Sequence, residues 1–539
     1  TNKNSLYDSY IRAIRWASDR LSATCSATKD KGIICYVSNA SFIDSNSADG
    51  MRKCLAEEFT DIYIFNLRGN ANTSGELRRK ERGNVFGEGT RCPIAVTLFV
   101  KAGEDGSRRP HGIHYYEVGD YLTREEKLKA LDEGVSFGEM LRAGEMRGIE
   151  PNGYGDWVNH RSGDYESFVS LGNKKEDRPA IFDKRYSRGV VSGHDAYSFN
   201  FSREALCENM RTMIDAYSSR SDDVHKISWS RGLRQRAKRN EQIAFSDDAV
   251  RVGLYRPYVK EHMYFSEKVN EMILQMPAIF PKPDSKNMVI CVSGVGSNKD
   301  FSVLMTDCTP NYDTLSKTQC FPLFWYEEVE SKLFGSYTER LDGISDAMLT
   351  KFRTHYDDAG LTKEEVFCYV YGVLSSPEYA ARFGNDTKRV LARVPLVDGA
   401  ERFRKFCEAG RELGGLHVNY ESAEMWPLER DGLGGDLRVR KMRIVEERGE
   451  RVIRYNEGLT LRGIPSEAWE YRVNGRSALE WLVERYCDDE DKKSGLRNDC
   501  NAWGRERGEP DYVLKLIMRV VGVSVRTMRI LRDMPELGV

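Results

Sequence analysis

The densest run of side chains suited to binding a polyanion lies between Lys226 and Arg239, with the sequence KISWSRGLRQRAKR. Six of its residues are basic and none is acidic; the basic ones are Lys226, Arg231, Arg234, Arg236, Lys238 and Arg239. Guanidinium and ammonium groups neutralise phosphates, and arginine also reads guanine edges in the major groove. The run therefore predicts a DNA-binding surface, with a solvated helix face as the alternative.

Two more groups of cations share this chemistry. Arg256 and Lys260 alternate with aromatic residues in the segment 254–260 (LYRPYVK). The polar segment 68–83 lies between two expected strands and carries a third group: Arg68, Arg78, Arg79 and Lys80. In the whole chain, however, 81 basic residues face 83 acidic ones, giving a formal net charge of −2. This balance excludes a uniformly basic DNA-binding protein and leaves local basic surfaces.

The sequence holds no spacing that is typical of a metal or catalytic site. Its 8 histidines form no H-E-x-x-H pair, and its 12 cysteines form no C-x-x-C pair. No Ser-His-Asp or Cys-His arrangement can be recognised either. We therefore expect no metal ion and no catalytic residue in this chain. Most cysteines lie in apolar runs, which favours reduced core cysteines in a cytoplasmic protein.

Two glycine clusters resemble nucleotide-binding turns but are out of place. Phe86 to Gly89 (FGEG) precedes an expected strand, whereas the F-x-G-x-G turn that binds S-adenosylmethionine follows one. Gly294 to Lys299 (GVGSNK) does follow a strand, yet it lacks both the third glycine of a dinucleotide motif and the G-K-[ST] of a P-loop. The second cluster predicts a structural turn.

The elements that would position these residues begin with an α/β pattern. Leu6, Tyr10, Ile14, Ala17 and Leu21 recur at helical spacing, and the wholly apolar run 32–37 predicts a strand covered on both faces. A helix is expected over 49–59, and strands over 61–67 and 93–101. Helix, strand, helix, strand, loop, strand predicts half of an α/β sheet. Residues 102–150 are expected to be a charged connector.

The remainder changes character along the chain. Residues 151–330 are rich in aromatics and turn residues, which predicts a mixed and mainly β region. Residues 336–420 are expected to be helical, 421–470 to form a β module, and helices to run on to about residue 531. No apolar run approaches the roughly 20 residues that span a bilayer, so no membrane segment is expected. The first residues hold no signal peptide and no initiator Met, which suggests a fragment.

An ordered set of segments resembles a known family. Residues 31–101 are similar to the second half of an N6-adenine DNA methyltransferase of the gamma arrangement, through GIICYVSN (32–39), Phe42, MRKCL (51–55), DIYIF (61–65), Phe86 and PIAVTLF (93–99). Further segments are similar to type ISP restriction-modification enzymes; they are NLRGN (66–70), TSGELR (73–78), LYRPY (254–258), CFPLFWY (320–326), YVYGVLSSPEY (369–379) and AGREL (409–413). The resemblance covers nearly the whole chain.

This resemblance implies an architecture and a function. The fold would be an α/β, partial Rossmann-like methyltransferase subdomain (1–135), followed by a mixed α+β, β-rich target recognition region (136–335), a helical region (336–420) and a C-terminal β-then-α module (421–539). The family joins a nuclease, a DNA-translocating ATPase, a methyltransferase and a target recognition domain in one polypeptide. The chain would bind and recognise specific duplex DNA for N6-adenine methylation and coupled restriction. By resemblance, Phe86 takes the place of an aromatic that packs against the extruded adenine.

The departures from the family are equally informative. The N-P-P-[FY] tetrapeptide that grips the target adenine is absent, and so is the glycine-rich turn for S-adenosylmethionine. The nuclease, ATPase and methyltransferase segments would then lie upstream as parts of the same polypeptide. The cofactor would belong to that parent enzyme, and this chain alone is expected to be inactive. The alternatives are a stand-alone, non-catalytic DNA-specificity or interaction subunit and, more remotely, a scaffold that binds no DNA.

Overall fold

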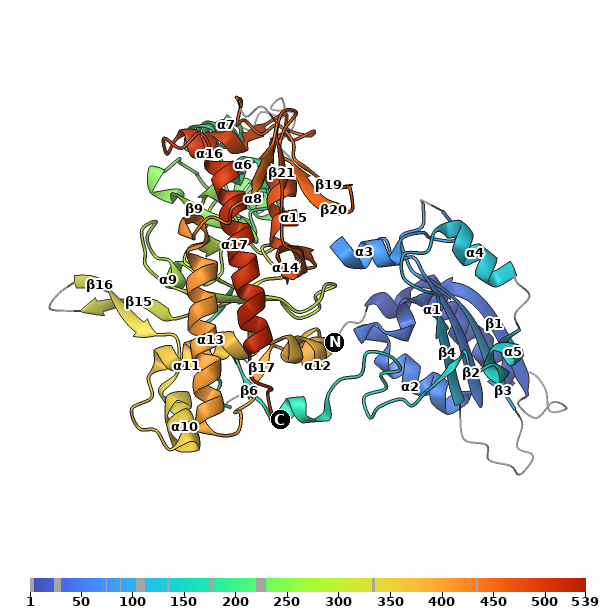
Figure 1. Ribbon diagram of the computed structural model, residues 1–539. Helices are drawn as coiled ribbons and strands as arrows, with labels where there is room; N and C mark the ends of the chain where they lie inside the picture. Colours follow the sequence, from blue (N-terminus) through green and yellow to red (C-terminus); the bar gives the residue numbers. More distant parts are fainter. Residues whose placement is uncertain are drawn as a thin grey trace. The chain divides into compact units, whose positions relative to one another are not determined.

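The computed structural model describes residues 4–23, 31–73, 75–87, 89–102, 112–132, 136–174, 178–219, 229–331, 335–432 and 435–539. The chain divides into two compact units, Thr1–Gly163 (unit 1) and Asp164–Val539 (unit 2), and each is described by itself (Figure 1). None of the helices in the described ranges combines the length and apolar character needed to cross a membrane.

Unit 1 is built on one mixed five-stranded sheet with the order β1-β3-β2-β4-β5. β3 runs antiparallel between β1 and β2, while β2 and β4 are parallel and β5 is antiparallel to β4. The strands are β1 (Gly32–Asn39), β2 (Asp61–Arg68), β3 (Ile94–Lys101), β4 (Gly112–Glu117) and β5 (Arg147–Ile149). The helices are α1 (Ser9–Ala23), α2 (Asp49–Glu58), α3 (Gly75–Glu81), α4 (Arg124–Asp132) and α5 (Phe137–Arg142).

The sheet of unit 1 is covered by helices on both faces. Ile14 of α1 and Leu55 of α2 pack with Ile62 and Ile64 of β2 on one face. On the other face, Met140 of α5 packs with residues that include Phe65 of β2. The strands expected at 32–37, 61–67 and 93–101 and the helix at 49–59 are therefore confirmed.

Three expectations for unit 1 are wrong. Residues 102–150 are no connector, because β4, β5, α4 and α5 arise from them and complete the sheet. The polar segment 68–83 contains a helix, α3. β1 is not covered on both faces, since it lies at the edge of the sheet and the side chains of Ile33 and Val37 are 65% and 54% exposed. On the face of the sheet that carries Ile33 and Val37, the helices pack against the other strands.

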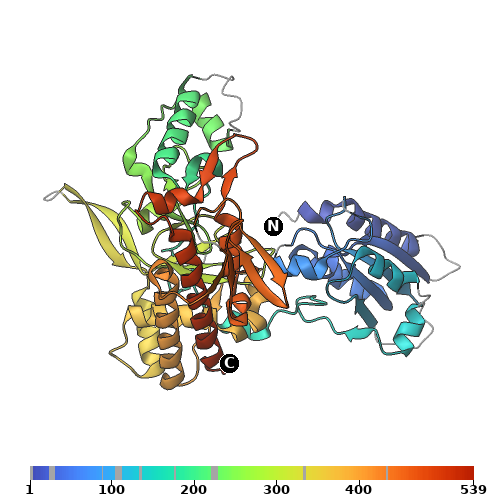
Figure 2. The ribbon, with the colours of Figure 1, turned by 45° about the horizontal axis from the view of Figure 1, so that its top comes forward.

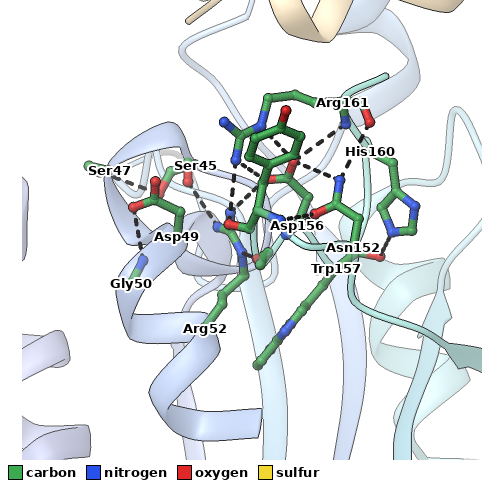
Figure 3. A network of polar contacts seen from close by, with 12 residues as sticks. Ser45, Ser47, Asp49, Gly50, Arg52, Asn152, Asp156, Trp157, His160 and Arg161 are labelled. Atoms are coloured by element: carbon green, nitrogen blue, oxygen red, sulfur yellow. Dashed lines mark hydrogen bonds and ion pairs between the residues drawn. The ribbon is translucent and has the colours of Figure 1, made fainter. Parts of the chain in front are cut away.

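The buried side chain of Arg52 joins α2 to the last residues of unit 1 (Figure 3). The Arg52 guanidinium on α2 donates to the carbonyl oxygens of Phe42, Ser45 and Gly155 at 2.9, 2.8 and 2.8 Å. It also pairs with Asp156 at 3.3 Å, and both side chains are almost completely buried. Arg161 binds the same carboxylate at 2.8 Å. Because Phe42, Ser45, Gly155 and Asp156 all lie outside α2, these bonds hold the last residues of unit 1 against its first helices.

Unit 2 contains several small sheets packed against long helices. Its larger sheets have the orders β13-β9-β10-β8, β12-β11-β14-β7 and β18-β21-β20-β19, and the remaining sheets are two-stranded. The β15–β16 ribbon reaches away from the other elements of the unit (Figure 2). Strands up to residue 342 are β6 (Val169–Ser170), β7 (Ser187–Arg188), β8 (Phe199–Asn200), β9 (Val250–Arg256), β10 (Val259–Tyr264), β11 (Val289–Val292), β12 (Val303–Thr306), β13 (Thr309–Pro310), β14 (Gln319–Pro322), β15 (Phe324–Ser331) and β16 (Gly335–Asp342).

The second half of unit 2 combines a helical group with a small β module. Strands also occur where helices were expected, at the start of 336–420 and between residues 470 and 500. Later strands are β17 (Arg393–Val394), β18 (Glu429–Asp431), β19 (Arg443–Glu447), β20 (Glu450–Arg454), β21 (Thr460–Arg462), β22 (Arg472–Val473), β23 (Arg476–Ser477), β24 (Asp488–Glu490) and β25 (Arg497–Asp499). The helices are α6 (Asp195–Ser198), α7 (Arg203–Ser219), α8 (Arg231–Lys238), α9 (Met276–Ile279), α10 (Asp346–Tyr356), α11 (Lys363–Ser375), α12 (Pro377–Thr387), α13 (Ala400–Val418), α14 (Ser466–Glu470), α15 (Ala478–Arg485), α16 (Cys500–Arg505) and α17 (Tyr512–Asp533).

Two glycines allow α11 and α13 to cross closely. A Cβ atom at Gly372 would lie 2.2 Å from the carbonyl oxygen of Phe406, and one at Gly410 would lie 1.9 Å from that of Cys368. The backbones therefore touch where any side chain would separate them. Among the described cysteines none forms a disulfide; Cys291, Cys320, Cys407 and Cys500 are buried as expected, but Cys35 and Cys54 are exposed.

The buried side chain of His417 links α13 to α11 and α17 through hydrogen bonds. His417 of α13 lies with Nδ1 2.6 Å from the Tyr371 hydroxyl of α11 and with Nε2 3.0 Å from the Thr527 hydroxyl of α17. The Tyr471 hydroxyl, just after α14, lies 3.2 Å from the same Nε2. Tyr471 in turn lies 2.8 Å from the hydroxyl of Tyr258 in the β9–β10 turn. Segments more than 200 residues apart thus share one hydrogen-bonded cluster.

This cluster makes the stability of unit 2 depend on pH. Burial lowers the pKa of His417 to about 3, whereas an unfolded histidine titrates near about 6.5. Between those values the unfolded chain binds one more proton, so the free energy of unfolding decreases as pH falls, by about 1.4 kcal/mol per unit. In His417→Gln, chemical denaturation at a series of pH values should show a shallower decrease below about pH 6.5. Parallel curves for the two proteins would contradict the assignment.

Candidate nucleic-acid interface

The structure turns the basic run before residue 240 into one helical surface. Ser230 caps α8 by accepting a hydrogen bond from the Leu233 backbone N–H at 3.2 Å, and buried Leu233 anchors the helix. The cations of α8 fall into two sets. Arg231, Arg234 and Lys238 are exposed and have no carboxylate partner among the described residues; the Arg234 guanidinium donates to the carbonyl oxygen of Trp229 at 3.0 and 2.8 Å. Their spacing puts them on one face of the helix.

The other two cations of this run are already paired. Arg236 binds the Glu241 carboxylate at 2.7 Å, and Arg239 lies 3.7 Å from the same carboxylate. Lys226 lies outside the described residues. The α8 face available to a phosphate backbone therefore consists of Arg231, Arg234 and Lys238.

The cations of segment 68–83 are largely engaged within unit 1. Arg68 binds Glu81 at 3.1 Å and also Asp120, while Lys80 binds Asp120 at 3.1 Å. Arg79 pairs with Glu76 on its own helix, and Arg78 donates to the carbonyl oxygen of Arg82. The pKa of Asp120 is held below its usual range, chiefly by the hydrogen bond from Arg68. These contacts hold the segment between β2 and β3 in place within unit 1.

Lys260 is also committed to the interior. Its side chain is almost buried beside a cavity of about 550 Å³, where the ammonium group lies 3.2 Å from Asp307 and 3.0 Å from Glu421. Two carboxylates balance the one charge, which is how a buried cation is tolerated. Lys260 therefore stabilises unit 2 from within.

Arg256 belongs to a cluster that the sequence does not reveal. It ends β9, and its guanidinium carbon lies 4.0 Å above the Tyr255 ring; Arg485 of α15 lies 5.9 Å from the same ring. Around the Trp481 ring lie the Lys299 ammonium at 5.6 Å and the Arg476 guanidinium at 4.9 Å. We call Arg256, Lys299, Arg476 and Arg485 the cation cluster. Aromatic faces attract cations and leave their outer sides free to bind an anion.

Glu484 and Asp195 partly balance this charge. Glu484 pairs with both Arg476 and Arg485, and Asp195 lies 3.8 Å from Arg256. Lys299 has no carboxylate partner within ion-pair distance among the described residues. Burial lowers the pKa of Lys299, and the charge of Arg476 lowers it further, to about 8. Burial and neighbouring like charges both disfavour the charged form of a lysine.

Each member of the cluster stands alone in its own segment, which explains why no basic run indicates it. Lys299 is the last residue of the glycine turn 294–299, Arg476 begins β23, and Arg485 ends α15. The only signal in the sequence is the glycine turn. It is indeed a structural turn, because a Cβ at Gly294 would lie 2.1 Å from the carbonyl oxygen of Lys317.

Phe86 and the neighbouring glycines lie in a turn before β3. Phe86 is 62% exposed, and its backbone N–H donates to Asn84 Oδ1 at 3.0 Å. The ring is therefore held on a hydrogen-bonded turn with its faces open. Since Gly87 and Gly89 precede β3 rather than link a strand to a helix, the described residues of unit 1 do not fit S-adenosylmethionine by the family's turn. Within the described ranges no group of three His, Cys, Asp or Glu side chains is placed to hold a metal ion.

The depressed pKa of Lys299 has a chemical signature. Acetic anhydride acylates only the neutral amine, so mass spectrometry over a pH series should give Lys299 a modification midpoint near pH 8. Lys299 of the denatured chain serves as the reference, with the midpoint of about 10.4 of an unperturbed lysine. Arg476→Gln removes a like charge and should move the Lys299 midpoint of the folded chain upward. Equal midpoints for Lys299 in the folded and the denatured chain would argue against the cluster.

Known proteins share this architecture. The family described as the Type ISP C-terminal specificity domain matches residues 180–516. Among solved structures, a nuclease-deletion mutant of the Type ISP enzyme LlaGI with a DNA substrate mimic is 36% identical, with a TM-score of 0.80 over 99% of this chain. The ATP-dependent Type ISP enzyme LlaBIII bound to DNA is 33% identical, with a TM-score of 0.81 over 100%. The DrdV–DNA complex is 33% identical, with a TM-score of 0.77 over 98%.

The chain spans only 48%, 34% and 52% of the lengths of those three proteins. No curated protein matches it. Because the specificity-domain family covers more than half of the chain, and these relatives match almost all of it at 33% identity or more, the chain belongs to the Type ISP restriction-modification enzymes.

Proposed function

We propose that this chain binds and recognises specific duplex DNA within a larger restriction-modification protein. The observation that carries the proposal is the cation cluster, whose four members all lie inside the segment matched by the specificity-domain family. Converging cations fit phosphate groups, and phosphate contacts fix the register in which base edges are read. The α8 face supplies three further exposed cations.

We further propose that unit 1 is the later part of an N6-adenine methyltransferase domain. β1 and β2 are both antiparallel to β3 and hence parallel to each other, with α2 between them in sequence. The exposed apolar face and free edge of β1 suit a sheet that continues beyond it. Other segments of the same polypeptide would bind S-adenosylmethionine and would contain the catalytic tetrapeptide, the nuclease and the ATPase.

Binding of duplex DNA tests the first proposal directly. The 539-residue chain should bind a labelled mixed-sequence duplex in fluorescence anisotropy, with an affinity that falls steeply as salt increases. Replacing Arg231, Arg234 and Lys238 with Gln should reduce the slope of log K against log salt by about 0.9 for each phosphate that the variant no longer neutralises. The matched variant Arg236→Gln, Arg239→Gln changes cations that Glu241 already engages, and its slope should change less.

Failure of the unaltered chain to bind duplex at low salt would overturn the proposal and favour a scaffold that binds no DNA. Retention of the full salt slope by the α8 triple variant would show instead that α8 is only a solvated face.

The exposed ring of Phe86 allows a test of the methyltransferase proposal. A base extruded from the duplex offers a π-face, and stacking on an aromatic ring contributes roughly 1–3 kcal/mol. In a protein that also carries the catalytic tetrapeptide, Phe86→Ala should slow adenine methylation by about 10- to 100-fold. A duplex with 2-aminopurine at the target position should fluoresce more strongly in the variant, because the stacked ring quenches it. An unchanged rate and unchanged emission would make Phe86 an ordinary turn residue.

A further inference from the structure

The segment 437–443 (LRVRKMR) of unit 2 presents a row of cations that belongs to neither the α8 face nor the cation cluster. Val439 and Met442 are buried, whereas Arg438, Arg440, Lys441 and Arg443 are exposed. Among the described residues none of these four side chains forms an ion pair. We call the four exposed cations the basic strip.

Side-chain amides hold the first residues of this segment in place, and Arg443 at its end begins β19 and pairs with β20. Asn501 makes two contacts with Val439: its Oδ1 accepts from the backbone N–H and its Nδ2 donates to the carbonyl oxygen, both at 2.8 Å. Asn456 Nδ2 donates to the carbonyl oxygens of Asp436 and Arg438 at 2.7 and 3.1 Å. The backbone is thus ordered before any ligand binds, which lowers the entropy cost of binding.

The strip lines a groove of about 730 Å³. Arg454 adds a fifth cation to the wall and is paired with Glu447 at 2.8 Å. The acidic residues of the groove are Asp436, whose Oδ1 accepts from the Arg438 backbone N–H at 2.9 Å, and Glu457. Positive charge therefore predominates, and the four members of the strip are free to bind an anionic partner.

We infer that the basic strip binds the phosphate backbone of duplex DNA, an inference that rests on the function proposed above. At about 3.3 Å per residue the strip extends at most about 16 Å, which matches the rise of about five base pairs. Arg438, Arg440 and Lys441 lie on irregular backbone before the β19–β20 pair, and not on a helix or a two-stranded ribbon of the kind that enters the major groove. Its contacts are therefore with phosphates, and they add affinity equally to every sequence.

The test compares two double variants of the whole chain. Arg440→Gln with Lys441→Gln removes two charges of the strip. Lys351→Gln with Arg529→Gln removes two exposed cations from α10 and α17, which likewise have no ion-pair partner among the described residues. Duplex affinity is measured by fluorescence anisotropy across a salt series. Thermal unfolding verifies that both variants fold.

The strip variant should bind at least about tenfold more weakly near 0.1 M salt, with a salt slope smaller by about 1 to 2. The decrease in affinity should be the same for any duplex sequence, and the control should stay within about twofold of the unaltered chain. If the unaltered chain binds duplex while both variants behave alike, the inference is overturned and the proposed function stands. If the unaltered chain does not bind duplex at all, both are overturned.

Discussion

The hydrogen bonds of one buried imidazole join the segments of unit 2 that carry Arg256 and Arg476. His417 connects Tyr371 and Tyr471, and through Tyr471 it reaches Tyr258. Tyr258 lies two residues after Arg256, and Tyr471 lies five residues before Arg476. A neutral side chain with two ring nitrogens, surrounded by hydroxyl groups, can satisfy every partner without burying a charge. The cations around Trp481 and Tyr255 are therefore placed by the core rather than by flexible surface loops.

The cationic groups of this chain differ in physical character although their residue types are the same. The α8 face and the basic strip are open to solvent, so their attraction for phosphates is screened by salt within about 10 Å. Lys299 is partly buried among like charges. Salt therefore screens its attraction for phosphates less, but burial disfavours the charged form of its amine. Exposed cations favour rapid, sequence-independent encounter, whereas a half-buried cluster favours one fixed arrangement.

The sequence predicts the strands and helices whose apolar pattern is regular, such as β2, β3, α2 and α11. It does not predict β4 and β5, because charged segments separate these short strands from the rest of the sheet. For the site, the run before residue 240 gives the α8 face. Burial of Lys260 beside two carboxylates depends on residues 47 and 161 positions away, which no local pattern contains. The basic strip escapes prediction because buried Val439 and Met442 have the i, i+3 spacing of a helix, whereas the segment forms no helix.

The Arg52 cluster has a consequence for the order in which the chain folds during synthesis. The bond between Arg52 and Asp156 closes a loop of 104 residues. A ribosome must therefore release all of β2, β3, β4 and β5 before the guanidinium finds its carboxylate. Until then the Arg52 guanidinium lacks the carboxylate that compensates its charge in the interior. A contact between residues so far apart in the sequence adds to the contact order of unit 1, and a high contact order is associated with slow folding.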